Sequence, residues 1–223
     1  MSTRAMIVVG GGSSSRFGSD KLLAEVGGKA LVSHTVSAIR DLVDKCVLVS
    51  HPDIIERISS LGLGVEIVPG GSSRTLSEMA GLAVLGDEFD LIGIHDAARP
   101  LVDPKLVDQL FLSAETTGGA VPVQEPEDLL VDRGLLKPVD RPGVVQTPQV
   151  FRGPELHAAY LRSEQAGSEG HDTVEIVHRF GQLEIAAVPG DPANIKVTFP
   201  EDLELVRRIV RRRAEDPSRS EPR

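Results

Sequence analysis

The chain has 223 residues, with 24 lysines and arginines against 33 aspartates and glutamates, which gives a formal net charge of −9 at pH 7. This length predicts one domain with a sizeable core, and the acidic balance argues against nucleic acid as a partner. A single cysteine, Cys46, excludes an intramolecular disulfide framework and suits a cytoplasmic location. We expect neither a signal peptide nor a membrane anchor, because the first apolar run is short and ends in glycine.

Apolar runs rich in β-branched residues recur through the first half of the chain and are typical of strands buried on both faces of a sheet. They lie at residues 6–9, 46–49, 65–68 and 91–94. Segments with helical spacing at 31–43 and 76–85 separate them, which gives a βαβαβαβ order. We therefore expect an α/β fold with a doubly wound, mostly parallel sheet.

In such sheets ligands bind beyond the carboxyl ends of the strands. Polar and charged side chains that directly follow the strands should therefore meet at one edge of the sheet. The segments in question are 10–21, 50–52, 69–77 and 95–100.

Residues 122–142 break this rhythm with four prolines and a charged stretch. Apolar residues at 129–131 and 135–136 flank a turn signal at 132–134, so we expect a protruding β-arm. Such an arm exposes apolar side chains that need cover. A second copy of the chain would supply it, which predicts a homodimer.

The last third of the chain returns to regular elements. The spacing predicts helices at 156–161, 174–180 and 201–212, and a strand at 183–188. Residues 214–223 are rich in charge and proline, and we expect a disordered tail there. The folded domain would then span residues 1–213.

The loop after the first run is rich in glycine and hydroxyl groups and then carries two cations. Gly10, Gly11, Gly12 and Ser13 can present several backbone N–H groups to a ligand, while Arg16 and Lys21 would neutralise it. Lysine is scarce in this chain, so a lysine in this loop favours a functional role. The loop matches neither the Walker pattern nor the dinucleotide pattern, and it suits a nucleoside triphosphate.

A second cluster, residues 95–100, follows the run at 91–94. Asp96 is the candidate metal ligand, because Mg²⁺ binds through one or two carboxylates together with substrate oxygens. A turn or helix cap is the alternative role for Asp96. His95 receives no role, since a histidine here more often packs and bonds within the protein.

Three further clusters complete the set. Residues 70–77 open a helix and place Gly71 and Ser77 where a base or ribose could be read. Residues 146–149 contain Thr147, and residues 194–198 place another scarce lysine, Lys196, at the end of a strand. Each cluster alone could be a turn or capping motif.

Together these motifs resemble the 2-C-methyl-D-erythritol 4-phosphate cytidylyltransferase family of sugar and polyol-phosphate nucleotidyltransferases. The resemblance runs from about residue 6 to residue 205, and it includes Arg141, the run His95-Asp96-Ala97-Ala98-Arg99-Pro100 and the run Asn194-Ile195-Lys196-Val197-Thr198. It implies a Rossmann-like nucleotidyltransferase domain. It also implies an enzyme of the non-mevalonate isoprenoid pathway that uses CTP and Mg²⁺.

The resemblance further implies roles for individual residues. Arg16, Lys21, Arg141 and Lys196 would be catalytic, and Asp96 would hold the metal ion. Gly71 and Ser77 would join the glycine loop in binding CTP. The polyol phosphate would be met by Arg99, Arg141, Thr147 and His171, with the arm reaching across a dimer.

The sequence departs from the family where threonines would face the polyol phosphate. Leu129 and His171 stand at these two positions, and Val131 replaces a lysine. A ribitol 5-phosphate or other polyol-phosphate cytidylyltransferase, or a non-catalytic nucleotide-binding relative, therefore stays as an alternative. The first loop also resembles that of molybdenum-cofactor nucleotidyltransferases, but the matches beyond Asp96 argue against that class.

Overall fold

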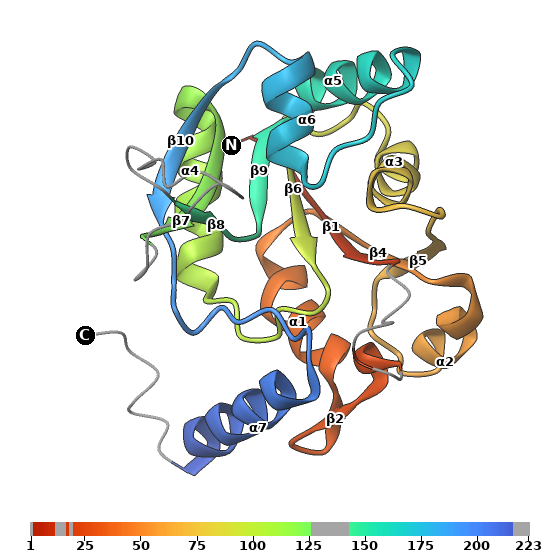
Figure 1. The fold of residues 1–223 in the computed structure, drawn as a ribbon, viewed down its shortest axis with the longest axis vertical. Helices are drawn as coiled ribbons and strands as arrows, with labels where there is room; N and C mark the ends of the chain where they lie inside the picture. Colours follow the sequence, from red (N-terminus) through yellow and green to blue (C-terminus); the bar gives the residue numbers. More distant parts are fainter. Residues whose placement is uncertain (1, 12–16, 18–19, 126–142, 216–223) are drawn as a thin grey trace, which may run out of the picture.

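The computed structural model describes residues 2–11, 17, 20–125 and 143–215. Their main sheet has the strand order β10-β7-β9-β6-β1-β4-β5, with β8 paired to β7 (Figure 1). The strands are β1 (Arg4–Gly10), β4 (Lys45–Ser50), β5 (Glu66–Pro69), β6 (Leu91–Asp96), β7 (Gly118–Gln124), β8 (Val144–Val145), β9 (Gln149–Arg152) and β10 (Glu184–Pro189). The four strands expected in the first half are all present.

The sheet is mostly parallel, as expected. β1 pairs in parallel with β4 and β6, β4 with β5, and β7 with β10. Strand β9 is antiparallel to both β6 and β7, between which it lies, so the sheet is mixed.

Helices cover both faces of the sheet, which confirms the doubly wound arrangement. Successive side chains of β1 alternate between two cores. Met6 and Val8 pack in one core with residues of α1 (Leu31–Ile39) and α4 (Pro104–Thr117). Ile7 packs in the other with residues of α3 (Arg74–Leu85), α5 (Gly153–Gln165) and α6 (Thr173–Phe180).

Smaller elements complete the described fold. A hairpin of β2 (Glu25–Val26) and β3 (Lys29–Ala30) lies beside α7 (Pro200–Glu215), where Arg207 Nε donates to the Glu25 carbonyl at 2.8 Å (Figure 1). A short helix α2 (Ile55–Ser59) precedes β5. The 3₁₀ turns are η1 (Lys21–Leu23), η2 (Arg40–Leu42) and η3 (Pro52–Ile54). Within the described ranges no helix is both long and apolar enough to cross a membrane.

The three helices and the strand expected in the last third are present as α5, α6, α7 and β10, with ends shifted by up to four residues. Three other segments differ from those expected. Residues 122–124, which we assigned to the arm, are the end of β7, and residues 126–142 of the arm lie outside the described residues. The helix expected at 31–43 ends at Ile39 and continues as the 3₁₀ turn η2. Residues 214 and 215, assigned to the tail, are the last two of α7, and the remainder of the tail lies outside the described residues.

Candidate active site

Asp96 is the last residue of β6, and three basic side chains surround its carboxylate. Its Oδ2 atom lies 3.0 Å from Lys196 Nζ and 3.2 Å from Arg99 Nε. Its Oδ1 atom accepts a hydrogen bond from Arg74 Nη1. Asp96 is 5 % exposed, so this cluster is built into the protein at the carboxyl end of the strand. The structure therefore brings together Asp96, Arg99 and Lys196.

The three neighbouring cations keep this carboxyl group ionised. Burial opposes its ionisation, but Arg74, Lys196 and Arg99 together hold the pKa of Asp96 well below its usual range. Arg74 also pairs with Glu78, so three positive charges stand against two carboxylates and still leave an excess of positive charge at this edge of the sheet. Such an excess favours an anionic ligand.

A directed chain of hydrogen bonds fixes the backbone of Asp96. The Asp96 N–H donates to Thr147 Oγ1 at 3.0 Å, and Thr147 Oγ1 lies 3.0 Å from His95 Nδ1. The other ring nitrogen, His95 Nε2, lies 3.2 Å from the carbonyl oxygen of Arg99, which can only accept. His95 is therefore a neutral ring that donates from Nε2 and accepts the Thr147 hydroxyl at Nδ1.

Burial agrees with this assignment for His95, whose pKa it lowers to about 4. Thr147 is also buried, and both hydrogen-bonding functions of its hydroxyl are used within the protein. The structure thus places Thr147 beneath Asp96 as a support of the site.

The loop that carries Lys196 follows β10 and is irregular, so Lys196 does not stand directly at a strand end as expected. Asn194 anchors the loop, since its Nδ2 donates to the Thr147 carbonyl at 2.8 Å and its own carbonyl accepts from Arg99 Nη1 at 2.7 Å. The Val197 N–H donates to the Ala98 carbonyl at 2.8 Å. These bonds hold Lys196 against Asp96.

Lys21 joins the same region from the other side of the site. Its Nζ donates to the Val197 carbonyl at 3.1 Å, next in the chain to Lys196. The glycine loop before it begins at Gly10, at the carboxyl end of β1, which pairs with β6. Lys21 and Lys196 are therefore brought to one edge of the sheet, as the sequence predicts.

Gly11 of the loop lies against Ser77 in the first turn of α3 and against Gly70. A Cβ atom on Gly11 would lie 2.4 Å from Ser77 Oγ, and one on Gly70 would lie 2.8 Å from the same atom. Ser77 is buried, and its hydroxyl donates to the Ser73 carbonyl at 2.8 Å. Two backbone segments and Ser77 thus pack closely, with Gly71 beside them against Leu76. No side chain larger than hydrogen would fit at Gly11 without displacing Ser77.

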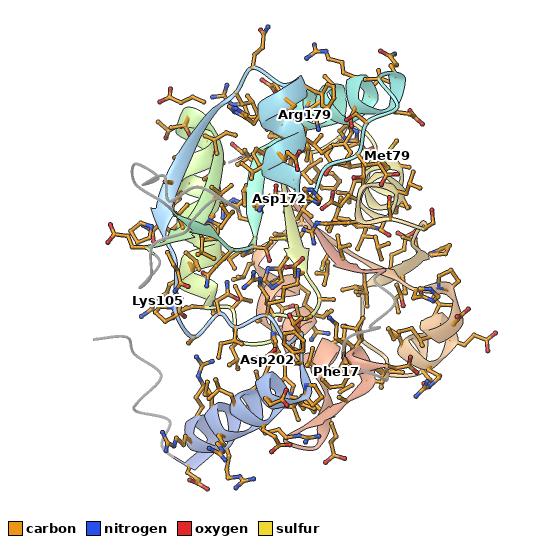
Figure 2. All side chains as sticks on the ribbon, viewed as in Figure 1. Phe17, Met79, Lys105, Asp172, Arg179 and Asp202 are labelled. Atoms are coloured by element: carbon orange, nitrogen blue, oxygen red, sulfur yellow. The ribbon has the colours of Figure 1, made fainter. Side chains whose placement is uncertain are left out.

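Of the other candidate residues, the structure describes only His171. Gly12, Ser13, Arg16, Leu129, Val131 and Arg141 lie outside the described residues. His171 is described and exposed, one residue before Asp172, which caps the N-terminus of α6 and is labelled in Figure 2. The His171 N–H donates to Glu175 Oε2 at 2.8 Å.

The sequence analysis missed one component of this region, the buried Glu78. It follows Arg74 by one helical turn on α3, and Arg74 Nε lies 2.9 Å from its Oε1. Burial opposes the charge of Arg74, but the carboxylates of Asp96 and Glu78 raise the pKa of Arg74 above its ordinary value. The signal was present as an acidic side chain on the apolar face of a helix, four residues after an arginine.

The residues at Asp96 suit a metal ion that arrives with its substrate. No cluster of three or more histidine, cysteine or acidic side chains that could hold a metal occurs among the described residues. Asp96 is a single hard oxygen donor, and Mg²⁺ is commonly held by one or two carboxylates with the remaining positions filled by phosphate oxygens and water. The donor set therefore fits Mg²⁺ bound together with a polyphosphate.

The fold and this site are those of an α/β nucleotidyltransferase, a class that positions a nucleoside triphosphate beyond the carboxyl ends of its strands. The features that indicate this class are the cations at the end of β6, the closely packed glycine loop and the single hard carboxylate. The family model described as 2-C-methyl-D-erythritol 4-phosphate cytidylyltransferase matches residues 4–212. The chain belongs to this family, which uses CTP and acts in the non-mevalonate pathway to isoprenoids.

Individual relatives agree over nearly the whole chain. The 2-C-methyl-D-erythritol 4-phosphate cytidylyltransferase of Rubrobacter xylanophilus is 35 % identical across 98 % of this chain and 100 % of its own length. That of Cereibacter sphaeroides is 37 % identical across 93 % of this chain and 97 % of its own. The crystal structure of the Thermus thermophilus enzyme superposes with a TM-score of 0.80 at 29 % identity, covering 95 % of this chain and 100 % of that one. The predicted fold, family and activity are confirmed.

Proposed function

We propose that the Asp96 cluster is the reaction site at which this enzyme joins CTP to 2-C-methyl-D-erythritol 4-phosphate. A phosphate oxygen of the polyol phosphate attacks the α-phosphorus of CTP and forms the new P–O bond. The bond between the α-phosphorus and the oxygen bridging to the β-phosphorus breaks, and its electron pair leaves with pyrophosphate. The observation that carries this proposal is the placement of Arg74, Arg99 and Lys196 around one buried carboxylate at the end of β6.

Charge neutralisation is the main task of the protein in this step. The transition state gathers the charges of a triphosphate and an incoming phosphate monoester, and pre-positioned cations stabilise it without reorganisation. Lys21 and Lys196 supply two of these cations, both tied to the backbone segment at 196–197 or to Asp96. We assign Arg16 to the same role from its place in the loop.

The start of α3 and the glycine loop bind the nucleotide in this proposal. Gly10, Gly11, Gly12 and Ser13 face the phosphates with their backbone N–H groups, and Gly71 and Ser77 meet the base or ribose. The tight packing of Gly11 against Ser77 supports one continuous nucleotide surface. A Cβ atom at Gly11 would disrupt it.

Mg²⁺ would be held by Asp96. When bound it supplies positive charge to the phosphate oxygens of CTP. Arg74, Arg99 and Lys196 pair with Asp96 in the structure. Their positive charges would therefore act on a ligand bound at Asp96 as well as on the carboxylate. These three side chains keep the carboxylate ionised and oriented.

The acceptor phosphate would be met by Arg99, Arg141 and His171, from three separate segments. Thr147 contributes indirectly, through its bonds to Asp96 and His95. We also propose a homodimer through the arm. The antiparallel pairing of Val123 with Val145 and of Gln124 with Val144 brings the two ends of the arm side by side, and Val144 is 46 % exposed there.

The test is a panel that crosses CTP, UTP, ATP and GTP with 2-C-methyl-D-erythritol 4-phosphate, ribitol 5-phosphate and related polyol phosphates, read by pyrophosphate release. We expect turnover with CTP and the erythritol phosphate in the presence of Mg²⁺, and its loss in Asp96→Asn. Turnover by Asp96→Asn at the wild-type rate would show that the Asp96 cluster is not the reaction site. CTP binding without turnover of any acceptor would identify a non-catalytic relative.

A further inference from the structure

Glu78 is a buried carboxylate at which three helices meet. It is 1 % exposed and lies on α3. Tyr160 of α5 donates its hydroxyl to Glu78 Oε2 at 2.5 Å. Thr173, the first residue of α6, donates its hydroxyl to Oε1 at 3.0 Å. Arg74 Nε lies 2.9 Å from the same Oε1 atom. Tyr160 and Thr173 therefore approach Glu78 from two other helices, and Arg74 approaches it from the preceding turn of α3.

Three donor side chains converge on two oxygen atoms, Tyr160 and Thr173 by hydrogen bonds and Arg74 as an ion pair. A carboxylate suits this arrangement because it is purely an acceptor and is negatively charged. Burial raises the pKa of Glu78, while Arg74, Tyr160 and Thr173 lower it in part. Burial and the neighbouring Glu78 raise the pKa of Tyr160 well above its ordinary value, so its hydroxyl keeps the proton that it donates. A glutamine side chain would offer one acceptor oxygen to the same three donors.

Arg74 links this buried network to the reaction site. Its guanidinium reaches Asp96 through Nη1 and Glu78 through Nε. Its Nε and Nη2 atoms are buried and have no hydrogen-bond acceptor among the described residues, so its contact with Glu78 is an ion pair. Since a buried N–H group without an acceptor is costly, the position of this guanidinium must be held by its two carboxylate partners.

The same network holds the segment before α6. Thr75 Oγ1 lies 3.2 Å from the Gly170 N–H, and the Val174 N–H donates to Gln149 Oε1 at 2.8 Å. Together with the bond from Thr173 to Glu78, these contacts tie residues 170–174 to α3 and to β9. His171, the exposed residue that we assign to the acceptor phosphate, lies within this segment. In Figure 2, Asp172 marks the inner end of α6 and Arg179 its outer end.

We propose that Glu78 is a positioning residue for cytidylyl transfer. Held by Tyr160 and Thr173, it fixes Arg74 against Asp96 and, through Thr173, ties the segment around His171 to α3. This inference rests on the proposed function, because it requires Asp96 and Arg74 to lie in the reaction site. Glu78 itself touches no substrate in this account and acts through Arg74.

The first test replaces Glu78 with glutamine. We expect Glu78→Gln to lower kcat by about tenfold while the KM for CTP changes by less than about threefold, because the nucleotide surface at Gly11 and Ser77 is untouched. An unchanged kcat would overturn the proposal. The matched control is Glu204→Gln, a glutamate paired with Arg207 on the exposed side of α7, which should keep wild-type kcat.

A double-mutant cycle separates positioning from a merely structural role. If Glu78 acts through Arg74, the double variant Arg74→Lys with Glu78→Gln loses no more kcat than Arg74→Lys alone, about tenfold. Independent effects would multiply to about a hundredfold, and that result would overturn the proposal. Urea unfolding of each variant shows whether kcat follows stability, which a structural role requires and positioning does not.

Tyr160→Phe provides a second route should Glu78→Gln fail to fold, because it keeps the carboxylate and removes one donor. We expect its kcat to fall about threefold, with no further loss in the Arg74→Lys background. Wild-type kcat in Tyr160→Phe would overturn the proposal.

Asp96→Asn distinguishes a failure of the proposed reaction site from a failure of the role proposed for Glu78. If it stays fully active, the proposed reaction site fails, and the role of Glu78 fails with it. If it is inactive while Glu78→Gln and Tyr160→Phe retain kcat, the role of Glu78 fails alone.

Discussion

The Nζ atom of Lys196 lies 3.0 Å from the Oδ2 atom of Asp96, although one side chain belongs to the loop after β10 and the other ends β6. Sequence analysis gave the lysine a catalytic role and assigned the aspartate to a metal ion. The contact shows that the two charges neutralise each other in the described structure. In the function that we propose, a triphosphate with Mg²⁺ would satisfy both groups, because the metal ion would be held by the carboxylate and the phosphates by the lysine.

Lys196→Met should lower kcat by about a hundredfold, because it removes a cation that faces developing charge in the transition state. The stem of methionine keeps most of the packing. Steady-state kinetics with both substrates measure the effect. Lys105→Met serves as the control, since Lys105, labelled in Figure 2, is exposed at the start of α4 and is not one of the three basic residues that pair with Asp96 in the described structure. Equal kinetics of the two variants would contradict the assigned role.

Lys21→Ala should affect turnover far more than nucleotide affinity. Its contribution strengthens as negative charge redistributes over the phosphate oxygens in the transition state, so we expect kcat to fall by about a hundredfold and the KM for CTP to change by less than about threefold. Direct titration with CTP provides the affinity independently of turnover. A loss confined to KM would refute a transition-state role. Lys29→Ala, in the exposed part of β3, controls for the loss of a lysine nearby.

His95 should make the stability of the protein depend on pH below neutrality. Burial lowers its pKa from 6.5 to about 4, so the unfolded chain binds a proton before the folded chain does as the pH falls. The free energy of unfolding should therefore decrease between pH 6.5 and pH 4, by about 3 kcal/mol at most from this group. Above pH 6.5 this group makes no further difference. The lowered pKa of Asp96 acts in a more acidic window, below its ordinary value of 3.8.

Urea unfolding at a series of pH values measures this dependence in the wild type and in His95→Gln. The glutamine variant can still donate to the Arg99 carbonyl but cannot take up a proton. Its free energy of unfolding should change less between pH 6.5 and pH 4 than that of the wild type. Parallel curves for the two proteins would show that another group causes the dependence.

Gly81→Ala should destabilise the protein although alanine is the better helix former. Alanine gains about 1 kcal/mol in helix propensity, but its Cβ would lie 2.5 Å from Ile7 Cγ2 of β1, and such overpacking costs about 1 to 3 kcal/mol. Because α3 carries Arg74, Ser77 and Glu78, kcat should fall as well. Urea unfolding and kinetics test both effects. Ala83→Gly, on the exposed side of α3, calibrates the propensity term, and stabilisation by Gly81→Ala would contradict the close packing.

The arm should determine the oligomeric state. Serine at both Leu135 and Leu136 removes apolar side chains that a second copy would cover, so we expect sedimentation velocity to show a monomer where the wild type is a dimer. Leu61→Ser is the control, because Leu61 is exposed and is separated from the arm in sequence by β5, α3, β6 and α4. A wild-type monomer, or an unchanged dimer in the double serine variant, would contradict this interface.

Much of the fold could be predicted because the first strands are continuous apolar runs between helices with clear periodicity. Helix α4 was missed although Asp103 caps it, Pro104 opens it and Gly118 ends it with φ 108°, and its exposed Leu112 weakens the apolar pattern. Strand β7 was missed because it begins with two glycines and contains Pro122, which are unfavourable in strands.

The site was predictable where residue type and strand ends coincide, as for Asp96 and Lys21. Sequence alone could not reveal that Lys196 pairs with Asp96, because the loop at 190–199 has no periodicity. Nor could it reveal the partners of Glu78. Tyr160 and Thr173 reach that carboxylate from two other helices, and only the packing of α5 and α6 against α3 brings them together.

Only one residue, Gln146, separates strand β8 from Thr147, the residue that supports Asp96. Val145 ends β8, and Thr147, whose hydroxyl holds the backbone of Asp96, is two positions further along the chain. In the homodimer that we propose, a displacement of β8 would therefore pass through Gln146 alone before it reached the hydroxyl that holds the Asp96 backbone.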